Sequence, residues 1–406
     1  MKLLYVHQHF STPLGSAGTR SYENARRMVA DGHKVLMVCG SYGAGNTGLY
    51  GKFMRGQRRG IVDGIEVIEF DLAYKNRDGF ARRIVIFARF AIQSTIVAIV
   101  EKYDVIVATS TPLTAALPGL AARWLRRKPF VFEVRDLWPE LPRAMGIVKN
   151  RVVLAALSAF ERCAYRSAHR LIGLAPGIVD GIASHNVSRN RIALVPNGCD
   201  LEMFAPDDIT ETPSGINNRA LRAIFCGTHG LANGLNAVLD AAGELMHRNR
   251  HDIEFVLVGD GACKAQLQAR AVAEMLTNVT FLNPIGKREL VSLLSTADVG
   301  LQILADIPAF YYGTSPNKFF DYLAAGLPTL NNYPGWVASM INENHCGWTV
   351  APGNASAFAD ALSDAADNRD ETRAMGHRAL ELARRSFDRD KLATEWVRWV
   401  EGVQNC

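Results

Sequence analysis

One stretch of this sequence decides how the chain folds and binds: Ser315-Pro316-Asn317-Lys318-Phe319-Phe320-Asp321-Tyr322-Leu323-Ala324-Ala325-Gly326-Leu327-Pro328. Its apolar residues predict a short helix that stops at Gly326 and Pro328. Polar Ser315 and Asn317 and cationic Lys318 stand at the expected helix start, where free backbone N–H groups and the helix dipole favour an anion. We therefore expect a phosphate at the helix start and a ribose diol on Asp321. The alternative is an ordinary amphipathic helix with an N-terminal cap.

This stretch resembles the donor-binding segment of the retaining glycosyltransferases of family 4, which have the GT-B fold. In that family two spaced glutamates precede a helix of small residues that ends in Gly-x-Pro, and the second glutamate holds the ribose hydroxyls. Asp321 matches the second glutamate in shortened form, whereas Gly313 stands at the position of the first. The resemblance implies an α/β protein of two Rossmann-like, doubly wound domains that face each other across a cleft.

A second signature occurs near the middle of the chain, in Pro196-Asn197-Gly198-Cys199-Asp200-Leu201-Glu202-Met203-Phe204-Ala205-Pro206. It resembles the Pro-Asn-Gly-x-Asp-x-x-x-Phe-x-Pro signature of the same transferases, which follows the last strand of the N-terminal domain. We therefore expect an N-terminal acceptor domain over residues 1–200, a linker over Asp207 to Arg219, and a donor domain over 201–386. The last helix, about 387–406, is expected to pack back on the N-terminal domain.

Short apolar runs alternate with helix-like segments, which is typical of parallel sheets covered on both faces. In the first half the runs are Leu3 to Val6, Val35 to Cys39, Ile65 to Phe70, Val105 to Ala108, Phe130 to Val134, Arg170 to Leu174 and Ile192 to Val195. In the second half they are Ala223 to Cys226, Glu254 to Val258, Val279 to Leu282, Val299 to Ile303 and Thr329 to Leu330. A length of 406 residues with 48% hydrophobic content also fits two domains.

The cysteines and the first residues indicate the compartment. The seven cysteines form no C-x-x-C pair, so they favour a reducing cytosol over a disulfide scaffold or a zinc site. The apolar run after Met1 ends at His7-Gln8-His9, which is too early for a signal peptide, and we interpret it as a first buried strand.

Charge is distributed unevenly. Residues 1–200 carry 28 Lys and Arg against 15 Asp and Glu, a balance of +13, so the rest of the chain carries −8. Basic residues cluster in the runs 52–59, 75–83 and 123–128. Nucleic acid is one partner of such a surface, but the motifs that read it are missing, and an anionic membrane fits better.

Residues 82–100 support the membrane interpretation. The segment is largely apolar and opens with two arginines, but Arg89 and Gln93 make its middle too polar for a comfortable span. We expect an interfacial helix that places the protein in the cytoplasm, peripheral to the inner face of the bacterial inner membrane. The alternative is a buried helix with Arg89 at its edge.

Two glycine-rich loops follow expected strands. The resemblance assigns Gly15, Ser16 and Gly18 of the first loop to the donor phosphates, because glycine lets the backbone approach an anion. In the second loop it assigns four donor contacts, at Gly227, His229, Gly230 and Asn233. Most family members have an arginine and a lysine where Thr228 and Asn233 stand, so we expect Lys318 to be the main phosphate cation. A subgroup of bacterial O-antigen and capsule transferases, similar to the N-acetylfucosaminyl transferases, shares this glycine-rich loop together with a Ser-Pro-Asn-Lys-like segment.

Two further segments complete the expected site. By resemblance, Gly259 ends a strand beside the donor, and Ile285 or Gly286 reads the nucleobase through the backbone, with uracil expected and guanine left open. The charged run Phe132 to Pro142 follows an apolar strand, where doubly wound folds place ligands.

From this run and the first strand end we expect three catalytic residues besides Lys318. Arg135 stands where many relatives have a histidine that touches the donor sugar, and Asp136 follows it. A structural ion pair between these two is the alternative. His9, at the end of the first strand, is expected to hold donor or acceptor.

The resemblance implies a metal-independent hexosyltransferase without a cofactor that retains the anomeric configuration. Asp388-Arg389-Asp390 imitates a metal motif, but its place beside a C-terminal helix favours a cap. The expected donor is a nucleotide diphosphate sugar, UDP-linked and N-acetylated. The expected acceptor is a glycan or polyprenyl-diphosphate glycan of lipopolysaccharide or O-antigen biosynthesis. The alternatives are a nucleotide-sugar 2-epimerase of the same fold and a non-catalytic, membrane-associated nucleotide-binding protein.

Overall fold

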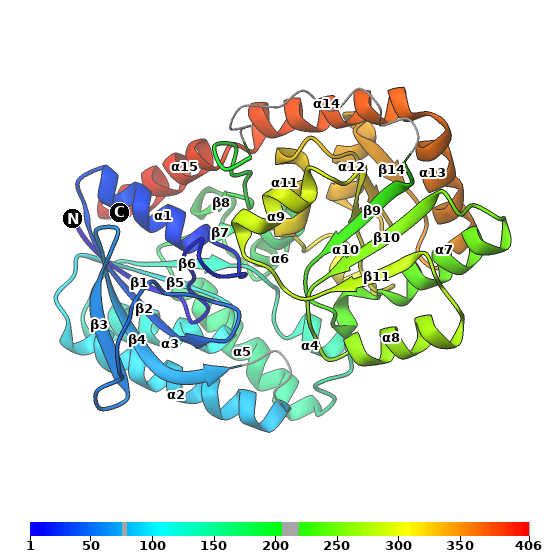
Figure 1. Cartoon of the computed structure of the whole chain (residues 1–406). Coiled ribbons are helices and arrows are strands. Elements are labelled where there is room, and N and C mark those ends of the chain that lie inside the picture. The colour runs from blue at the N-terminus through cyan, green and yellow to red at the C-terminus, as the bar shows by residue number, and fades with distance from the viewer. Residues whose placement is uncertain (75–78, 205–218, 406) are drawn as a thin grey trace. The chain divides into compact units, whose positions relative to one another are not determined.

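The chain forms two compact units in a computed structural model that describes residues 1–74, 79–204 and 219–405 (Figure 1). The N-terminal unit comprises Met1–Asn197, Tyr312–Ser315 and Arg389–Cys406, and the C-terminal unit comprises Gly198–Tyr311 and Pro316–Asp388. All of the expected linker except Arg219 lies outside the described residues, as do Ala205 and Pro206 of the second signature and residues 75–78 of the second basic run.

The N-terminal unit is built on one eight-stranded sheet in the order β3-β4-β2-β1-β5-β6-β7-β8. Its strands are β1 (Lys2–Val6), β2 (Lys34–Tyr42), β3 (Gln57–Val62), β4 (Ile65–Tyr74), β5 (Val105–Thr109), β6 (Phe130–Val134), β7 (Arg170–Gly173) and β8 (Ile192–Leu194). All neighbours are parallel except β3, which pairs antiparallel with β4 at the edge. Each expected apolar run of this half is a strand, and β3 is an additional one.

The edge strand β3 explains part of the basic run 52–59. Arg58 bonds Glu69 on β4 at 2.8 Å, and Arg59 bonds Glu66 and Glu101 at 2.6 and 2.7 Å. These arginines are therefore neutralised by cross-strand and neighbouring carboxylates, so this run adds less free charge to the surface than its composition predicts.

Helices cover both faces of this sheet (Figure 1). They are α1 (Arg20–Ala30), α2 (Phe80–Val100), α3 (Ala116–Leu125), α4 (Glu140–Ala144), α5 (Arg151–Ser167), α6 (Pro176–Ser184) and α15 (Arg389–Glu401). The last helix, α15, lies against α1, and its Trp396 ring stacks on Tyr5 of β1 at 5.2 Å between ring centroids. Residues from the two ends of the chain thus share one buried layer.

A buried ion pair lies beneath α15. Arg20 of α1 donates from Nε and Nη2 to Glu133 Oε2 at 3.1 and 3.0 Å, and both side chains are almost fully buried. Trp396 Nε1 donates to the same carboxylate oxygen at 2.9 Å, and Thr109 Oγ1 donates to the other at 2.6 Å. One carboxylate therefore joins α1, β5, β6 and α15.

The C-terminal unit has a second, fully parallel sheet in the order β11-β10-β9-β12-β13-β14. Its strands are β9 (Leu221–Cys226), β10 (Ile253–Val258), β11 (Val279–Leu282), β12 (Val299–Gln302), β13 (Thr329–Asn331) and β14 (Gly347–Thr349). Side chains alternate between two cores: Leu221, Ala223 and Phe225 enter one, and Ile224 and Cys226 enter the other. This alternation follows from the two-residue period of a strand and explains why the strands read as continuous apolar runs.

Eight helices are described around the second sheet. They are α7 (Asn236–His247), α8 (Lys264–Ala273), α9 (Lys287–Leu294), α10 (Pro308–Tyr311), α11 (Asn317–Ala324), α12 (Trp336–Glu343), α13 (Ala355–Asp367) and α14 (Arg369–Ser386). Apolar residues of α7, α8 and α13 form one core with the sheet, and residues of α9 and α11 form the other.

The helix α11 is the one that the opening stretch predicts. It is buried from Phe319 to Ala324, so it is not an ordinary amphipathic surface helix. The Tyr322 ring lies under β12, where a Cβ on Gly300 would come within 2.4 Å of it, and Phe320 packs against Trp336 and Phe387.

We expect Trp396→Ala to lower the free energy of unfolding by about 3–5 kcal/mol, because it removes a fully buried ring and leaves Glu133 one donor short. Chemical denaturation followed by circular dichroism measures the change. Trp124→Ala is the matched control, since that ring is 64% exposed and its loss should stay within about 0.5 kcal/mol. Equal effects of the two variants would contradict the anchoring role of Trp396.

Candidate functional site

Both sheets have a point where the strand order reverses. In the N-terminal sheet the chain runs outward from β1 to β2 and then returns to place β5 on the other side of β1. In the C-terminal sheet the same reversal lies between β9 and β12. Ligands of open parallel sheets bind at the carboxyl ends of the strands beside such a point. The candidate residues are therefore those that follow β1, β5, β6, β9 and β12.

In the C-terminal unit the expected glycine loops lie against one another. A Cβ on Gly259 would come within 1.9 Å of the Gly227 carbonyl oxygen, and one on Gly261 within 2.4 Å of the His229 carbonyl oxygen. Gly227 N donates to Val258 O at 2.9 Å, which joins the loop after β9 to the end of β10. Glycine is required here because any side chain would separate the two loops.

Lys318 joins these loops to the start of α11. Its Nζ donates to Asn233 Oδ1 at 3.0 Å and lies 4.8 Å from the centroid of the Phe225 ring, and its Cε lies under Gly227. Asn233 in turn donates from Nδ2 to Thr228 O at 2.7 Å. Among the described residues no carboxylate forms an ion pair with Lys318, and burial lowers the pKa of its amine to about 8. This is a cation that an anionic ligand would neutralise.

Asp321 lies one turn further along α11 and is 6% exposed. Its Oδ1 is paired with Lys287 Nζ, and the same ammonium lies 3.5 Å from Asp200 Oδ2. Lys287 begins α9 directly after Ile285 and Gly286, so the segment expected to read the base is joined to the carboxylate expected to hold the ribose. The expected donor residues Gly227, Asn233, Gly259, Ile285, Lys318 and Asp321 thus belong to connected segments at one edge of this sheet.

Two of the expected donor residues have partners within the protein. The ring of His229 is fully buried between Phe225 and Phe281, at 6.1 Å between centroids in each case. Burial lowers its pKa to about 4. Ser315 belongs to the N-terminal unit, where its hydroxyl oxygen accepts from Asn197 N at 3.0 Å. Its hydroxyl therefore holds the Asn-Gly turn.

The remaining expected donor residues lie in loops or at the start of a helix. Gly230 precedes a single helical turn that ends at Asn233. Asn317 is the first residue of α11. In the N-terminal unit the loop with Gly15, Ser16 and Gly18 runs between β1 and α1, and Ser16 N donates to Ala44 O at 2.9 Å. A Cβ on Gly15 would come within 2.4 Å of Ser11 Oγ. Close packing inside the loop therefore explains Gly15 without any ligand.

The expected catalytic residues of the N-terminal unit surround the ends of β1, β5 and β6. Arg135 donates from N to Ser110 Oγ at 2.9 Å and from Nη1 to His7 Nε2 at 3.0 Å. Asp136 Oδ2 accepts from Thr111 Oγ1 at 2.6 Å. Within the described residues each of these two side chains thus has a partner other than its neighbour.

His9 lies near the same strand ends. Its ring is 4.9 Å from Tyr42 and 6.3 Å from His7 between centroids. Burial, with the charges of Arg135 and Arg83, lowers its pKa to about 3. His9 is therefore neutral at physiological pH, which suits a hydrogen-bonding role and excludes service as a cation.

Three residues that contact the candidate site were not identified from the sequence. His7 contacts Arg135, Lys287 contacts Asp321, and buried Lys264 donates to Gly259 O and Leu282 O at 2.8 Å each. His7 stands two residues before His9, at the end of the same apolar run, which is a signal that could have been used. Nothing in the local pattern distinguishes Lys264 or Lys287 from a surface lysine.

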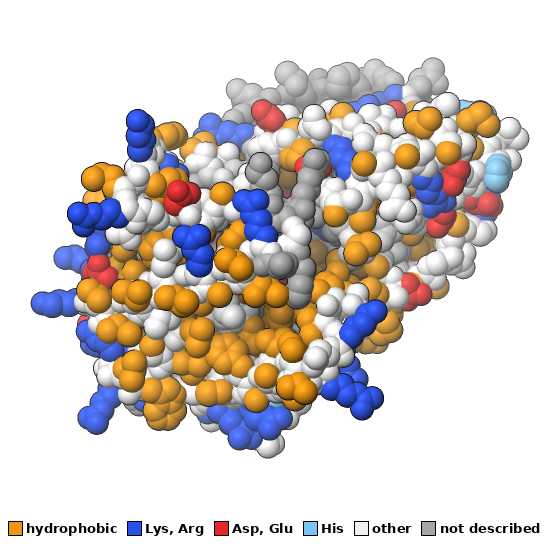
Figure 2. Space-filling view, turned by 90° about the horizontal axis from the view of Figure 1, so that it is seen from below, with side chains coloured by type: hydrophobic (Ala, Val, Ile, Leu, Met, Phe, Trp, Pro, Cys, Tyr) orange, Lys and Arg blue, Asp and Glu red, His pale blue; other side chains and the backbone are white. Residues whose placement is uncertain are grey.

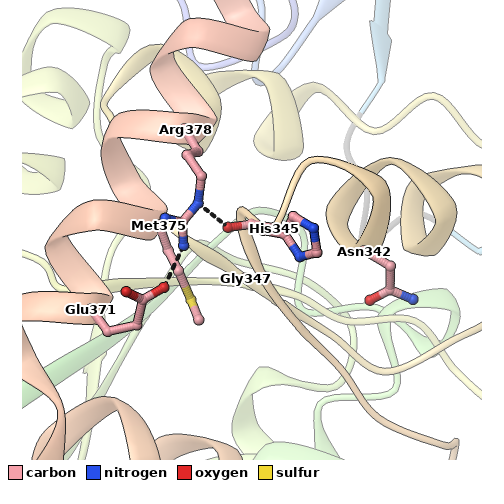
Figure 3. Close-up of a pocket in the computed structure, with 6 residues that line it drawn as sticks. All are labelled: Asn342, His345, Gly347, Glu371, Met375 and Arg378. Carbon is pink, nitrogen blue, oxygen red and sulfur yellow. Dashed lines mark hydrogen bonds and ion pairs between the residues drawn. The ribbon is translucent and has the colours of Figure 1, made fainter.

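A separate pocket of about 530 Å³ lies in the C-terminal unit (Figure 3). Its lining residues are Asn342, His345, Gly347, Glu371, Met375 and Arg378. Gly347 begins β14, so the pocket lies at the amino end of that strand, opposite the edge that carries Lys318. Arg378 is already bonded to Glu371 and to the carbonyl oxygen of His345. We assign this pocket no role in the candidate site.

Family models match both halves of the chain. Residues 15–198 match the glycosyl transferase 4-like domain, and residues 220–368 match the glycosyl transferases group 1 domain. The D-inositol 3-phosphate glycosyltransferase of Nocardia farcinica is 27% identical over 54% of this chain and 48% of its own length. The UDP-Gal:alpha-D-GlcNAc-diphosphoundecaprenol alpha-1,3-galactosyltransferase of Escherichia coli is 25% identical over 66% of this chain and 68% of its own. The chain spans about half the length of the first of these curated relatives.

Solved structures share the whole fold. The sucrose-phosphate synthase of Thermosynechococcus elongatus superposes with a TM-score of 0.75 at 15% identity, covering 100% of this chain and 99% of its own. HepE of Anabaena in complex with UDP-glucose superposes with a TM-score of 0.68 at 16% identity, covering 100% of both chains. At these identities the likeness shows the fold, which is the GT-B arrangement of two Rossmann-like domains.

We expect the affinity for uridine diphosphate to fall as the pH rises through about 8, because Lys318 is charged below that pH and loses its proton above it. Lys318→Ala should weaken binding at pH 7 by at least about tenfold and remove this pH dependence. Isothermal titration calorimetry between pH 7 and 9.5 measures both effects.

Lys318→Arg is the matched control for that titration, since a guanidinium stays charged over the whole range and should make the affinity flat. Unchanged binding by Lys318→Ala would show that another group holds the phosphates.

Proposed function

We propose that this chain, which has the GT-B fold and two glycosyltransferase domains, is a retaining hexosyltransferase that uses a nucleoside diphosphate sugar. The donor is UDP-linked and carries an N-acetylated hexose or deoxyhexose, and the acceptor is a lipid-linked or polysaccharide glycan of the bacterial surface. The subgroup that fits best is the one similar to the O-antigen and capsule N-acetylfucosaminyl transferases, because it shares the Ser-Pro-Asn-Lys segment.

One observation carries the proposal: Lys318, a partly buried ammonium, and Asp321, a buried carboxylate, lie one turn apart on α11 beside two apposed glycine loops. A diphosphate needs a cation and close backbone, and a ribose diol needs a carboxylate acceptor. The Lys287 ammonium beside Asp321 can donate to the ribose hydroxyls, or it can move away from Asp321 when those hydroxyls bind the carboxylate. The two charges thus match the two polar ends of a nucleoside diphosphate.

The chemistry follows from what these residues can do. As the bond between the anomeric carbon and the diphosphate breaks, negative charge develops on the leaving oxygen, and Lys318 with backbone N–H groups stabilises it. The acceptor hydroxyl attacks the anomeric carbon from the face that the diphosphate leaves, and its proton passes to the departing diphosphate oxygen, which retains the configuration without a protein nucleophile. Because Lys318 supplies the positive charge, we propose that no metal is required. Arg135, Asp136 and His9 hold the sugar and the acceptor.

The epimerase alternative is less well supported. The family models and the named relatives describe transfer, and the E. coli relative is named for a diphosphoundecaprenol acceptor. An epimerase would release a free isomer of the nucleotide sugar without an acceptor, whereas a non-catalytic protein would bind without turnover. Product analysis separates all three.

We expect saturation-transfer NMR against a panel of uridine and guanosine diphosphate sugars to show selective binding of a uridine donor. Asp321→Ala should abolish the ribose contacts and lower the affinity by about tenfold or more, because a charged hydrogen-bond acceptor is lost. Asp370→Ala is the matched control, since that carboxylate is 94% exposed on α14. Binding that Asp321→Ala leaves intact would contradict the assignment of α11.

We also propose that the N-terminal unit docks on an anionic membrane. Helix α2 contains a segment, Arg82–Val100, with mean hydropathy 1.8 that is long and apolar enough to span, and only 28% of it is buried. One face of α2 packs inward through Ile86, Phe90 and Ala98. A surface helix normally turns polar residues outward, but the outer face of α2 carries exposed Ile92 and Ile96.

The exposed apolar surface continues beyond α2. It includes Ile84, Val85, Ile92, Ile96, Ile99 and Val100 of α2, Leu117, Trp124 and Leu125 of α3, and Val152 and Val153 of α5. Figure 2 shows hydrophobic side chains gathered on this face with Lys and Arg around them. Arg89, Arg127, Lys149 and Arg151 are all exposed. An apolar face with basic residues at its rim fits the headgroup region of an anionic bilayer, with α2 lying along the surface.

We expect the Ile92→Glu, Ile96→Glu double variant to lose at least about tenfold in partitioning onto phosphatidylglycerol vesicles, because two exposed apolar side chains that would enter the bilayer are replaced by negative charges that the anionic lipid repels. Vesicle co-sedimentation measures this, with phosphatidylcholine vesicles as the neutral reference. Val272→Glu is the control, since Val272 is 79% exposed on α8 of the other unit. Equal binding of wild type to neutral and anionic vesicles would remove the electrostatic part of the proposal.

A further inference from the structure

We propose that His7 is a positioning residue that fixes the guanidinium of Arg135, an inference that rests on the function proposed above for Arg135. His7 follows β1, Arg135 follows β6, and β5 lies between these two strands in the sheet. The Arg135 side chain therefore reaches across the end of β5 to meet the imidazole. This places the contact at the point where the strand order of the N-terminal sheet reverses.

The contact has a defined direction. His7 is 2% exposed, its Nε2 lies 3.0 Å from Arg135 Nη1, and its Nδ1 lies 2.7 Å from Ser21 Oγ. A guanidinium has only N–H donors, so Nε2 must be the unprotonated acceptor. The ring proton is therefore on Nδ1 and is donated to Ser21 Oγ. Ser21 on α1 thus selects the tautomer that can hold Arg135.

The electrostatic surroundings keep this imidazole neutral. Burial and the charges of Arg135 and Arg20 hold the pKa of His7 well below its usual value. A protonated ring would lose its acceptor and repel the guanidinium, so the contact requires the neutral form at the pH of the cell.

Arg135 is held by an imidazole because the two carboxylates closest to it in sequence, Glu133 and Asp136, have other partners. Glu133 Oε2 accepts from Arg20 and Trp396, and Oε1 accepts from Thr109. Within the described parts of the chain no ion pair joins Arg135 to a carboxylate. His7 fixes the direction of the guanidinium without neutralising it, which leaves its charge for an anionic or sugar ligand. A bonded carboxylate would fix it equally well but would cancel that charge.

A double-mutant cycle tests whether His7 acts through Arg135. With the donor that the NMR panel selects, we expect His7→Phe to lower kcat about 10- to 100-fold with little change in KM, because misplacing a reacting group costs this much. His7→Gln, which keeps an acceptor, should recover most of the loss. Ser21→Ala, which frees the tautomer, should have an intermediate effect. In an Arg135→Ala background His7→Phe should have no further effect.

A second measurement does not depend on turnover. Long-range ¹H–¹⁵N spectra of ¹⁵N-histidine-labelled protein, with His7→Gln to assign the signal, should show Nε2 unprotonated and Nδ1 protonated between pH 5.5 and 8.5. A proton on Nε2 would overturn the inference, and so would additive effects of His7→Phe and Arg135→Ala. Full activity of Arg135→Ala would instead show that the proposed role of Arg135 is wrong, whatever His7 does. Thermal unfolding of each variant separates these results from a loss of fold.

Discussion

The buried ion pair between Arg20 and Glu133 organises the N-terminal unit. Two charges removed from water are tolerated only when each is paired and its remaining hydrogen-bonding sites are filled. Arg20 fills its sites with Glu133 and with the carbonyl oxygens of Val195 and Pro196, at 2.9 and 2.5 Å. Glu133 fills its own with Thr109 and Trp396. The last helix and the end of β8 are therefore fixed to the same pair as the first helix.

This pair also explains the charge at the candidate site. Glu133 is saturated by Arg20, Thr109 and Trp396, so Arg135, two residues later, is held by a neutral imidazole instead. The C-terminal unit repeats the arrangement with Lys318, which is held by the amide of Asn233 and the Phe225 ring. In each unit a cationic side chain at the carboxyl ends of the strands is thus held by neutral groups. That arrangement suits an anionic ligand, because a carboxylate partner would have to be displaced first.

The second consequence of the fold concerns α2. A helix that covers a parallel sheet needs one apolar face, and α2 has two. Its inner face fills the core against β4 and α3, and its C-terminus is capped by Arg126, which donates to Ile99 O and Glu101 O at 2.5 and 2.7 Å. One basic residue of the run 123–128 is therefore structural. The outer apolar face is exposed among the described residues, and this exposure is the basis of the proposed membrane contact.

The sequence predicted the strands well because a buried parallel strand needs an unbroken apolar run, and each run that we expected to be a strand is one. It missed β3 and β14, since edge strands are exposed on one or both sides and carry polar residues such as Arg58 and Arg59. The sequence also predicted α11 and its end before Gly326, because the residues that begin and end a helix lie within a few positions of its termini.

Only the tertiary structure decided how deeply each polar side chain is buried and which groups it contacts. His229 and Asp321 both looked like site residues, yet one is packed between two aromatic rings and the other is an ion-paired carboxylate beside Lys318. His7 and Lys287 acquire their roles from partners more than thirty residues away. Local sequence determines backbone conformation because the forces that set it act between near neighbours. The burial, charge state and direction of a side chain depend on distant segments, which meet only when the sheets are formed.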